Sequence, residues 1–579
     1  MPVRKAWNGK FQFIKQRHLS YHPMKQKIII YQVLPRLFGN LNPACTPHGT
    51  LSENGCGKMA DFTTKRLKEI KQLGANYIWY TGLLEHATQT DYSACGITPD
   101  HPAIVKGKAG SPYAIKDYYD IDPDLSTKPE RRMEEFESLL TRTHKAGLKV
   151  IIDFVPNHVA RQYHSDAKPK GAVDLGKNDQ TSHAFDPQNN FYYIPNESLH
   201  VPQTGTEVSD HYTEQPAKAT GNDHFDAWPS CNDWYETIKL NYGVDYCGGG
   251  TCHFDPIPDT WKKMYHILLF WVQKGVDAFR CDMAEMVPCA FWSWVIPQLK
   301  SNNPNLLFIA EVYNPSQYRH YIHDGHFDYL YDKVGLYDTL RSVACGHAPA
   351  STITGCWQSV DDIRDKMLNF LENHDEQRIA SDFFAGNPLA GKAAFLVSAC
   401  MYTNPVMLYA GQEVGERGMD AEGFSGCDGR TTIFDYWSVP SLRRWLTGTS
   451  EASECALRTF YQTVLKMCNK EKAIREGVFF DLMYANYDNH QFNSERQYTF
   501  IRKAGKDCLL VTANFCAEEQ HVGISIPQHA FDCLNLKEGT YTAIDLLSSE
   551  TTTIELTPDK LLHTTLPAYG GTVLKITMK

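Results

Sequence analysis

Short apolar runs alternate along the first part of the chain with segments in which apolar residues recur every three or four positions. The apolar runs are Ile28 to Val33, Asn76 to Tyr80 and Lys149 to Phe154, and their length and composition indicate buried strands. The segments between them, Thr63 to Leu73 and Lys128 to Ala146, have helical spacing, and each is followed by a glycine. This alternation predicts a parallel sheet whose strands are joined by helices.

The alternation stops after Asn157 and returns with the helical segment Trp261 to Val272. The residues between are rich in Asn, Asp, Gly, Pro and His, and a structureless loop of that length is uncommon inside a compact domain. We therefore expect an inserted subdomain at residues 157–255. Further strands end near Arg280, Glu311, Glu372 and Tyr409, and the runs after residue 473 are short and alternating, as in an antiparallel sandwich.

Four of the apolar runs deliver polar residues at their C-terminal ends. The run G-V-D-A-F-R-C-D ends with Arg280 and Asp282, which alternation places on one face of a strand. The runs F-I-A-E and F-L-E-N-H-D end at Glu311 and Asp375, and I-I-D-F-V-P-N-H ends at His158. Because the carboxyl ends of parallel strands meet at one rim, this pattern suggests a parallel barrel with a carboxylate active site there.

Composition narrows the classes of partner. The chain has 579 residues, a net charge of −10 and a pI of about 6.1, so nothing favours nucleic acid or an anionic membrane as a partner. We see no secretion signal and no apolar stretch of membrane-spanning length, and the 17 cysteines are an odd number without a repeating spacing. A cytoplasmic location is the expectation, and the oligomeric state stays open.

A zinc site is the less favoured interpretation of the cysteines around the sequence G-G-G-T. Cys247 and Cys252 bracket that sequence, and Cys231 and His253 lie near, but the spacing is not that of a structural zinc site. A structural or incidental pair is the preferred interpretation. No nucleotide, flavin or haem motif is present.

The four rim segments together resemble the recurrent segments of the alpha-amylase family, glycoside hydrolase family 13. They are D-F-V-P-N-H from Asp153, G-V-D-A-F-R-C-D from Gly275, F-I-A-E-V from Phe308 and E-N-H-D from Glu372, in the family order. The resemblance implies an α/β chain in which a (β/α)8 TIM barrel is formed by residues 27–156 and 256–473. It also implies the insertion after the third strand and a C-terminal antiparallel β-sandwich at 474–579, preceded in this chain by an extension at 1–26.

The resemblance implies retaining cleavage of glycosides with three carboxylates in named roles. Asp282 matches the nucleophile, Glu311 the acid/base and Asp375 the third acid, which supports the distorted sugar. Retention requires an ionised carboxylate and a protonated carboxyl roughly 5 to 5.5 Å apart. Arg280 beside Asp282 is expected to lower the pKa of that carboxyl, and an apolar neighbourhood after F-I-A is expected to keep a proton on Glu311. Taken singly, each acid is more often a helix cap or an ion-pair partner.

Further matches concern sugar binding. His158 and His374 match histidines that hydrogen-bond the sugar, and neutral imidazoles can donate to hydroxyls. Tyr113, in Y-A-I-K-D-Y, matches a tyrosine that stacks under the sugar, with core packing as the competing explanation. Arg378, in H-D-E-Q-R, resembles the exo-acting glucosidases, but Gly110 stands where they carry an aspartate. Arg378 then has no visible partner in the sequence. This favours a site that is open beyond the cleaved bond, with α-glucan chains as the substrate.

Other departures concern the leaving-group side and a metal. Glu285 and Met286 replace a Lys-His pair found in many alpha-amylases, and T-I-K-L-N-Y, with Lys239 and Asn241, replaces the usual insertion segment. Asn157 matches a position that supplies a calcium ligand in many relatives. Structural calcium is therefore considered, although it needs six to eight oxygens and the acids available in the insertion, Asp223, Asp226 and Asp233, are more often solvated. The chemistry itself needs no cofactor.

The leading hypothesis is hydrolysis of α-glucosidic bonds in α-glucans or malto-oligosaccharides. Transglycosylation on the same site is the enzymatic alternative, because a sugar hydroxyl can intercept the same intermediate. A non-catalytic carbohydrate-binding or transporter-partner relative is the alternative of another class. Such relatives typically lose catalytic carboxylates or gain a membrane span, whereas this chain keeps all three acids.

Overall fold

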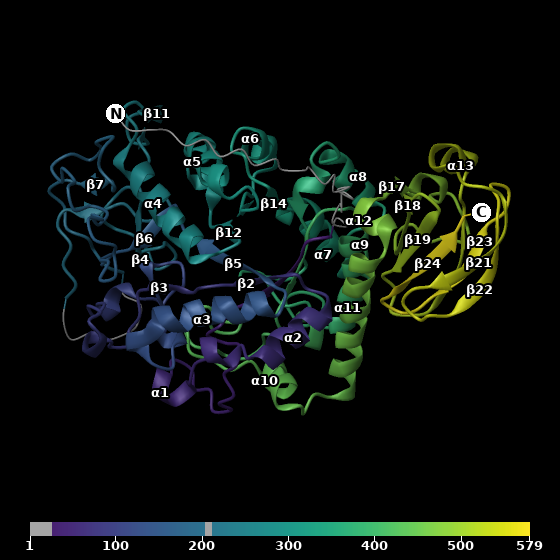
Figure 1. Ribbon diagram of the computed structural model, residues 1–579, viewed down its shortest axis with the longest axis horizontal. Helices are drawn as coiled ribbons and strands as arrows, with labels where there is room; N and C mark the ends of the chain where they lie inside the picture. The colour runs from purple at the N-terminus through teal and green to yellow at the C-terminus, as the bar shows by residue number, and fades with distance from the viewer. Residues whose placement is uncertain (1–25, 203–210, 579) are drawn as a thin grey trace, which may run out of the picture.

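The computed structural model describes residues 26–202 and 211–578. It has a large body containing a barrel and, at the right of Figure 1, a lobe of C-terminal strands next to the long helix α11 (Ala452–Lys470). The predicted extension at residues 1–26 lies outside the described residues, apart from Gln26.

Eight parallel strands form the barrel, which confirms the predicted fold class. They pair in the order β15-β14-β13-β12-β5-β2-β1-β16, and a parallel bridge from Asn369 to Val406 joins the two ends of the series. Their bounds are β1 Ile29–Val33, β2 Tyr77–Tyr80, β5 Lys149–Phe154, β12 Ala278–Cys281, β13 Leu307–Ala310, β14 Tyr329–Tyr331, β15 Met367–Leu368 and β16 Val406–Tyr409.

The strands read as continuous apolar runs because both of their faces are buried. In β1, Ile29, Tyr31 and Val33 belong to the large core between the strands and the surrounding helices, whereas Ile30 points to the other face. Every barrel strand contributes to the inner cluster, which includes Ile30, Tyr77, Trp79, Ile151, Ala278, Ile309, Tyr331, Leu368 and Met407. The barrel is therefore a packed core with its polar residues confined to the rim.

The helices that follow the strands form the outer layer. The predicted helices correspond to α2 (Thr64–Leu73), α3 (Arg132–Lys145) and α4 (Asp259–Lys274). Gly275 ends α4 in the left-handed conformation. The other helices of the body are α1 (Leu51–Asn54), α5 (Cys289–Asn302), α6 (Tyr318–His323), α7 (Asp338–Ala344), α8 (Thr352–Ser359), α9 (Gly391–Cys400), α10 (Pro440–Thr447), α11 and α12 (Lys472–Glu476).

Two excursions leave the barrel on the side of the strand C-termini. After β2, the chain makes the antiparallel pair β3 (Leu84–His86) and β4 (Ile115–Ile121). After β5, the segment predicted as an inserted subdomain contains three small ladders and no long helix among its described residues. The ladders pair β6 (His158–Ala160) with β9 (Thr237–Lys239), β7 (Tyr193–Ile194) with β8 (Ala217–Lys218), and β10 (Val244–Asp245) with β11 (Thr251–Cys252).

The C-terminal strands form the expected antiparallel domain. Six strands pair in the order β17-β18-β19-β24-β21-β22, and β20 pairs with β23, which packs on the larger sheet. Their bounds are β17 Val478–Asp481, β18 Gln497–Ala504, β19 Asp507–Asn514, β20 Gln520–Ile524, β21 Gly539–Asp545, β22 Thr551–Leu556, β23 Leu562–Leu566 and β24 Gly571–Thr577, with α13 at Gln528–Leu534.

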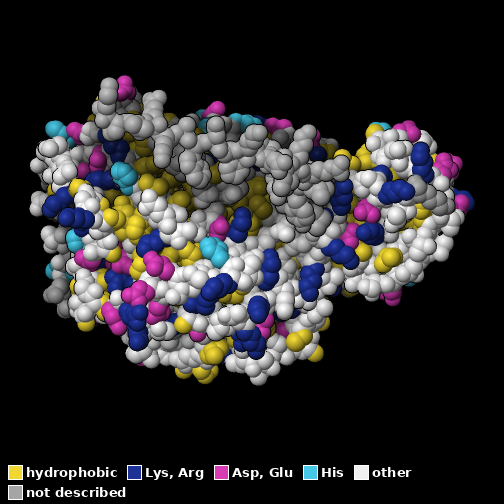
Figure 2. Space-filling model, viewed as in Figure 1, with side chains coloured by type: hydrophobic (Ala, Val, Ile, Leu, Met, Phe, Trp, Pro, Cys, Tyr) yellow, Lys and Arg dark blue, Asp and Glu magenta, His cyan; other side chains and the backbone are white. Residues whose placement is uncertain are grey.

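The surface carries charges of both signs. Lysine and arginine side chains are interspersed with aspartate and glutamate over the lower half of the face in Figure 2. This mixed pattern agrees with the modest net charge and gives that face no single-sign field. Among the described helices, none is long and apolar enough to cross a membrane.

Candidate active site

Three carboxylates converge at the C-terminal rim of the barrel. Asp282 directly follows β12 and Glu311 directly follows β13, whereas Asp375 stands seven residues beyond β15. Asp282 and Glu311 are buried and Asp375 is partly exposed. The register of the parallel strands brings the first two together, since Cys281 pairs with Ala310 in the ladder.

Arg280 joins the first two carboxylates. Its Nη1 donates to Asp282 Oδ1 over 2.7 Å, and its Nη2 lies 2.7 Å from Glu311 Oε2. The guanidinium is buried, and its Nε donates to the hydroxyl of Tyr331 on β14 over 3.1 Å. A planar group with fixed donors thus sets the spacing of the two acids.

The electrostatic balance at Asp282 differs from the expectation. Arg280 acts in the predicted direction, but burial has the largest effect and raises the pKa of Asp282 well above its ordinary value, with Glu311 and Asp375 adding to the increase. The prediction of a lowered pKa was therefore wrong, because sequence reasoning weighed the guanidinium without the desolvation. Clustered carboxyls of this kind titrate together and retain a proton that isolated ones would lose.

The surroundings of Glu311 are also more polar than the preceding F-I-A run indicates. The hydroxyl of Tyr313 donates to Glu311 Oε1 over 2.6 Å, and the backbone N–H of Met283 donates to Oε2 over 2.8 Å. The carboxyl has these two donors and the Arg280 guanidinium as its ion-pair partner, so the expected apolar neighbourhood was wrong. Sequence reasoning missed Tyr313, although its position two residues after Glu311 places it on the same face of the extended chain.

His374 links the third carboxylate to the side chains of Tyr113 and Gln32. Its Nε2 lies 2.9 Å from Asp375 Oδ2 and also contacts the hydroxyl of Tyr113, while Gln32 lies 2.8 Å from Nδ1. Burial by itself raises the pKa of Asp375, but His374 and Arg280 outweigh it and lower the pKa to about 2. Asp375 is thus the acid most firmly ionised at neutral pH.

The predicted stacking residue Tyr113 lies inside this group. Its ring packs against His374, with centroids 5.2 Å apart, and Arg280 lies 5.5 Å from its centroid. Trp79 flanks the guanidinium at 5.3 Å and donates its indole N–H to Asp153 over 3.1 Å. The structure therefore brings Tyr113 to the carboxylates, and its stacking on a sugar stays a prediction.

His158 stands at the same rim on β6. Its ring is buried, packs against Trp234 and contacts the side-chain amide of Asn157 through Nδ1 at 3.2 Å. Burial, with Lys239 and Lys106 nearby, lowers the pKa of His158 to about 3. The imidazole is neutral at pH 7, which is the form expected for hydrogen bonding to a sugar hydroxyl.

Arg378 pairs with a buried glutamate, although no partner for it could be recognised in the sequence. Its Nη1 donates to Glu372 Oε2 over 2.8 Å, its Nη2 donates to Thr431 Oγ1 over 2.8 Å, and the side chain is buried. Its donors serve the protein, so this geometry does not support a direct contact with sugar. Gly110 has φ +79°, and a Cβ there would lie 1.7 Å from the carbonyl oxygen of Ala87, which explains why no aspartate stands at this position.

These residues match a known family. A family model described as the alpha-amylase catalytic domain matches residues 32–434, which include every carboxylate of the site. The chain belongs to the alpha-amylase family. It is accordingly a glycoside hydrolase, which sets aside the non-catalytic alternative.

The relatives are distant but extend over most of this alpha-amylase-family chain. Neopullulanase 2 of Thermoactinomyces vulgaris is 20% identical over 545 residues, covering 89% of this chain and 74% of that protein. A cyclomaltodextrinase of a Bacillus species is 23% identical over 495 residues, covering 84% and 72%. The crystal structure of a noncanonic maltogenic alpha-amylase from Thermotoga neapolitana is similar with a TM-score of 0.62 at 18% identity, covering 96% of this chain and 99% of that one.

Asn157, the residue expected to bind calcium in this alpha-amylase-family chain, contacts a lysine side chain instead. Asn157 Oδ1 accepts a hydrogen bond from the Lys239 ammonium over 2.6 Å, and Asp223 pairs with the same ammonium. Asp226 accepts from the backbone of Trp228, and Asp233 from Ser230 and Asn222. Among residues 26–202 and 211–578, no group of three or more His, Cys, Asp or Glu side chains is placed to hold a metal, and the donor set around Asn157 does not fit calcium.

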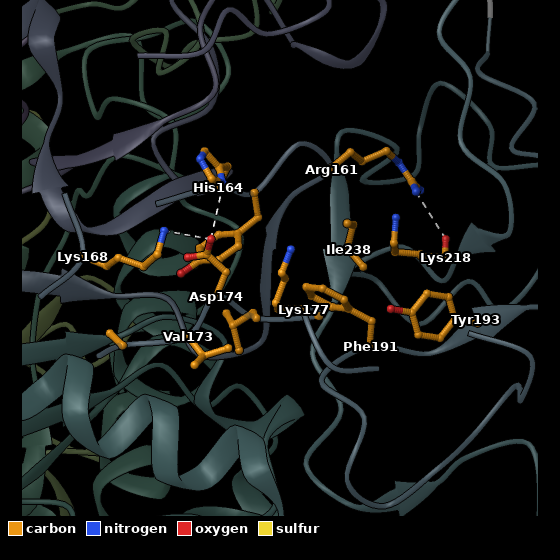
Figure 3. Close-up of a pocket in the computed structure, with 14 residues that line it drawn as sticks. Arg161, His164, Lys168, Val173, Asp174, Lys177, Phe191, Tyr193, Lys218 and Ile238 are labelled. Atoms are coloured by element: carbon orange, nitrogen blue, oxygen red, sulfur yellow. Dashed lines mark hydrogen bonds and ion pairs between the residues drawn. The ribbon is translucent and has the colours of Figure 1, made fainter. Parts of the chain in front are cut away.

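The inserted subdomain has a cavity of its own, of about 580 Å³. Figure 3 shows Phe191 and Ile238 facing it, with His164 and Lys168 directed at Asp174. Asp174 lies 3.0 Å from the Lys168 ammonium and 3.3 Å from His164. Since none of the carboxylates of the site lines this cavity, it lies apart from the active site.

Proposed function

We propose that this chain hydrolyses α-glucosidic bonds in α-glucans or malto-oligosaccharides by a retaining double displacement. Asp282 is the nucleophile, Glu311 the acid and then the base, and Asp375 the group that stabilises the transition state. The observation that carries the proposal is the Arg280 guanidinium, which lies 2.7 Å from a carboxylate oxygen of both Asp282 and Glu311. One rigid group thereby holds a nucleophile and an acid side by side, as retention requires.

In the first step, Glu311 transfers its proton to the glycosidic oxygen while Asp282 attacks the anomeric carbon. Since Oδ1 of Asp282 is held by Arg280, Oδ2 is the oxygen that forms the new bond. The bond from the anomeric carbon to the leaving oxygen breaks, and the shortened glucan leaves as an alcohol. The product of this step is a glycosyl ester on Asp282 and an ionised Glu311.

In the second step, Glu311 accepts a proton from water, which attacks the anomeric carbon and displaces Asp282. The hydroxyl of Tyr313 and the backbone N–H of Met283 donate to the two oxygens of Glu311 and so can hold its carboxyl in place during this step. Both catalytic groups return to their starting states, and two inversions leave the configuration at the anomeric carbon unchanged.

Asp375, His374 and Tyr113 hold the sugar at the cleaved bond in this proposal. The low pKa of Asp375 keeps a full negative charge next to the site where positive charge develops on the sugar. Two relatives, a neopullulanase and a cyclomaltodextrinase, support α-glucans or malto-oligosaccharides as the substrate class.

The test is a time-resolved product profile on maltoheptaose, pullulan and an aryl α-maltoside, with the anomer of the first product followed by NMR. The Asp282→Asn variant is the control, since it keeps the shape of the side chain and removes the nucleophile. We expect α-anomeric fragments that disappear with the variant.

Each other outcome counts against a stated part of the proposal. Products of the β-anomer would overturn the retaining mechanism, and products longer than the substrate would favour the transglycosylase alternative. An absence of turnover on all three substrates would overturn the α-glucan assignment. Equal activity of the Asp282→Asn variant would remove Asp282 from the nucleophile role.

A further inference from the structure

The side chain of Lys239 is buried under the inserted subdomain and makes three polar contacts. Its ammonium donates to Asn157 Oδ1 over 2.6 Å and to the backbone oxygen of Met286 over 3.3 Å, and it pairs with Asp223 Oδ1 at 2.6 Å. The Lys239 side chain is 2% exposed, whereas the Asp223 side chain is 41% exposed. An ammonium has three N–H donors, and three oxygens surround this one.

These three oxygens come from segments far apart in the sequence. Asn157 lies in the turn after β5, next to His158, and Asp223 lies in the inserted subdomain. Met286 ends the short turn that follows the nucleophile strand β12, and Met283 in the same turn donates its N–H to Glu311. A single positive charge therefore ties the inserted subdomain to the loops that carry the active site.

We propose that the Lys239 ammonium is a built-in cation that takes the place of a structural calcium ion in this chain. Without it, a carboxylate, an amide oxygen and a carbonyl oxygen would face one another with no positive charge between them. A calcium ion answers the same need, but it takes six to eight oxygens, whereas the ammonium is satisfied by the three present. The folded chain thus needs no calcium to join the insertion to the barrel.

The test measures metal content and thermal stability, and neither readout depends on the proposed glucan hydrolysis. The full chain is equilibrated with either EDTA or calcium chloride, and bound calcium is measured by mass spectrometry after desalting. For wild type we expect no stoichiometric calcium and the same Tm in both buffers. One tightly bound calcium per chain that is lost in Lys239→Ala would overturn the proposal.

Two variants separate the charge of Lys239 from its volume. Lys239→Met keeps most of the volume without the charge, and we expect a fall in Tm of at least about 3 °C that calcium does not reverse. Lys239→Ala leaves space among the three oxygens, and we expect a similar fall in EDTA that calcium chloride reverses at least in part. If the Tm of either variant in EDTA equals that of wild type, the Lys239 ammonium does not stabilise the fold.

Lys106 provides a matched control in the same region. Its ammonium is also buried and lies 3.0 Å from Glu236, but it contacts none of the three oxygens around Lys239. Lys106→Met is expected to lower the Tm equally in EDTA and in calcium chloride. A calcium-dependent Tm for Lys106→Met as large as that for Lys239→Ala would attribute the effect to the loss of any buried lysine, and the proposal would fail.

Discussion

The replacement of Arg280 by lysine tests whether geometry, and not only positive charge, holds the two proposed catalytic acids. The guanidinium donates hydrogen bonds to Asp282 over 2.7 Å and to the Tyr331 hydroxyl over 3.1 Å, and it forms an ion pair with Glu311 at 2.7 Å. A lysine ammonium keeps the charge but has no rigid fork, so it loses at least two of these contacts. Each charge-assisted hydrogen bond contributes about 1.5–3 kcal/mol, and the expected loss is therefore about 3–6 kcal/mol.

That loss corresponds to a decrease in kcat/KM of about 10²- to 10⁴-fold for Arg280→Lys. Because the contacts position the reacting groups, the decrease should lie mostly in kcat, with KM changed by less. The assay is steady-state hydrolysis of an aryl α-maltoside, together with the Tm from calorimetry. The reasoning is refuted if a folded Arg280→Lys enzyme keeps kcat/KM within tenfold of wild type.

Arg502→Lys serves as the matched control for a buried arginine. Arg502 is equally buried and donates to backbone oxygens of Ala473, Ile474 and Gly477, far in the fold from the carboxylates. We expect this variant to lose Tm while it keeps kcat. A loss of kcat in Arg502→Lys comparable to that in Arg280→Lys would mean that general destabilisation, and not the site, explains the result.

Three further changes test separate features. Tyr313→Phe removes the hydrogen bond to Glu311 and should lower kcat about 10- to 100-fold, and an unchanged kcat on the aryl maltoside would disprove the role of the hydroxyl. Gly110→Asp should lower the Tm strongly, because φ is +79° and the Cβ would lie 1.7 Å from the Ala87 oxygen; a Tm equal to that of wild type would contradict this. Burial raises the pKa of Glu372 from 4.5 to about 7, so the native carboxyl keeps a proton that the unfolded chain has lost. Wild-type unfolding free energy should therefore fall by about 3 kcal/mol relative to Glu372→Gln between pH 4.5 and 7, and parallel pH profiles in denaturant titrations would contradict it.

The order of the barrel strands could largely be read from the sequence, because each long apolar run is buried on both faces. The sixth strand, β14, escaped prediction. It has only three residues, Tyr329–Tyr331, and acids flank it on both sides, so it has too few apolar positions for a period to be recognised. The two-residue strand β15 was recognised only through the polar motif that follows it.

The position of a site residue could be predicted where the residue directly follows a strand. The contacts of that residue could not be predicted where loops from other parts of the chain supply them. Asp282 and Glu311 are placed by their strands, and the structure brings them together as expected. Their electrostatics could not be predicted, because the N–H of Met283 and the degree of burial depend on how the loops pack. From the sequence, Lys239 could be recognised only as an unusual polar position. Its pairing with Asp223 could not be predicted, because Asp223 lies in the insertion, whose sequence has no hydrophobic periodicity.

Burial disfavours full ionisation of the carboxyls in this site, and the proposed mechanism uses a proton held among them. Asp153, Asp282 and Glu311 lie around the single guanidinium of Arg280, with Asp375 beside them, so the carboxylates outnumber the positive charge. Burial raises the pKa of Asp153 as well as that of Asp282, despite Arg280, so full ionisation of the group is costly. The cluster therefore retains a proton at a pH where exposed carboxyls have none, and the proposed retaining mechanism needs one proton in its first step.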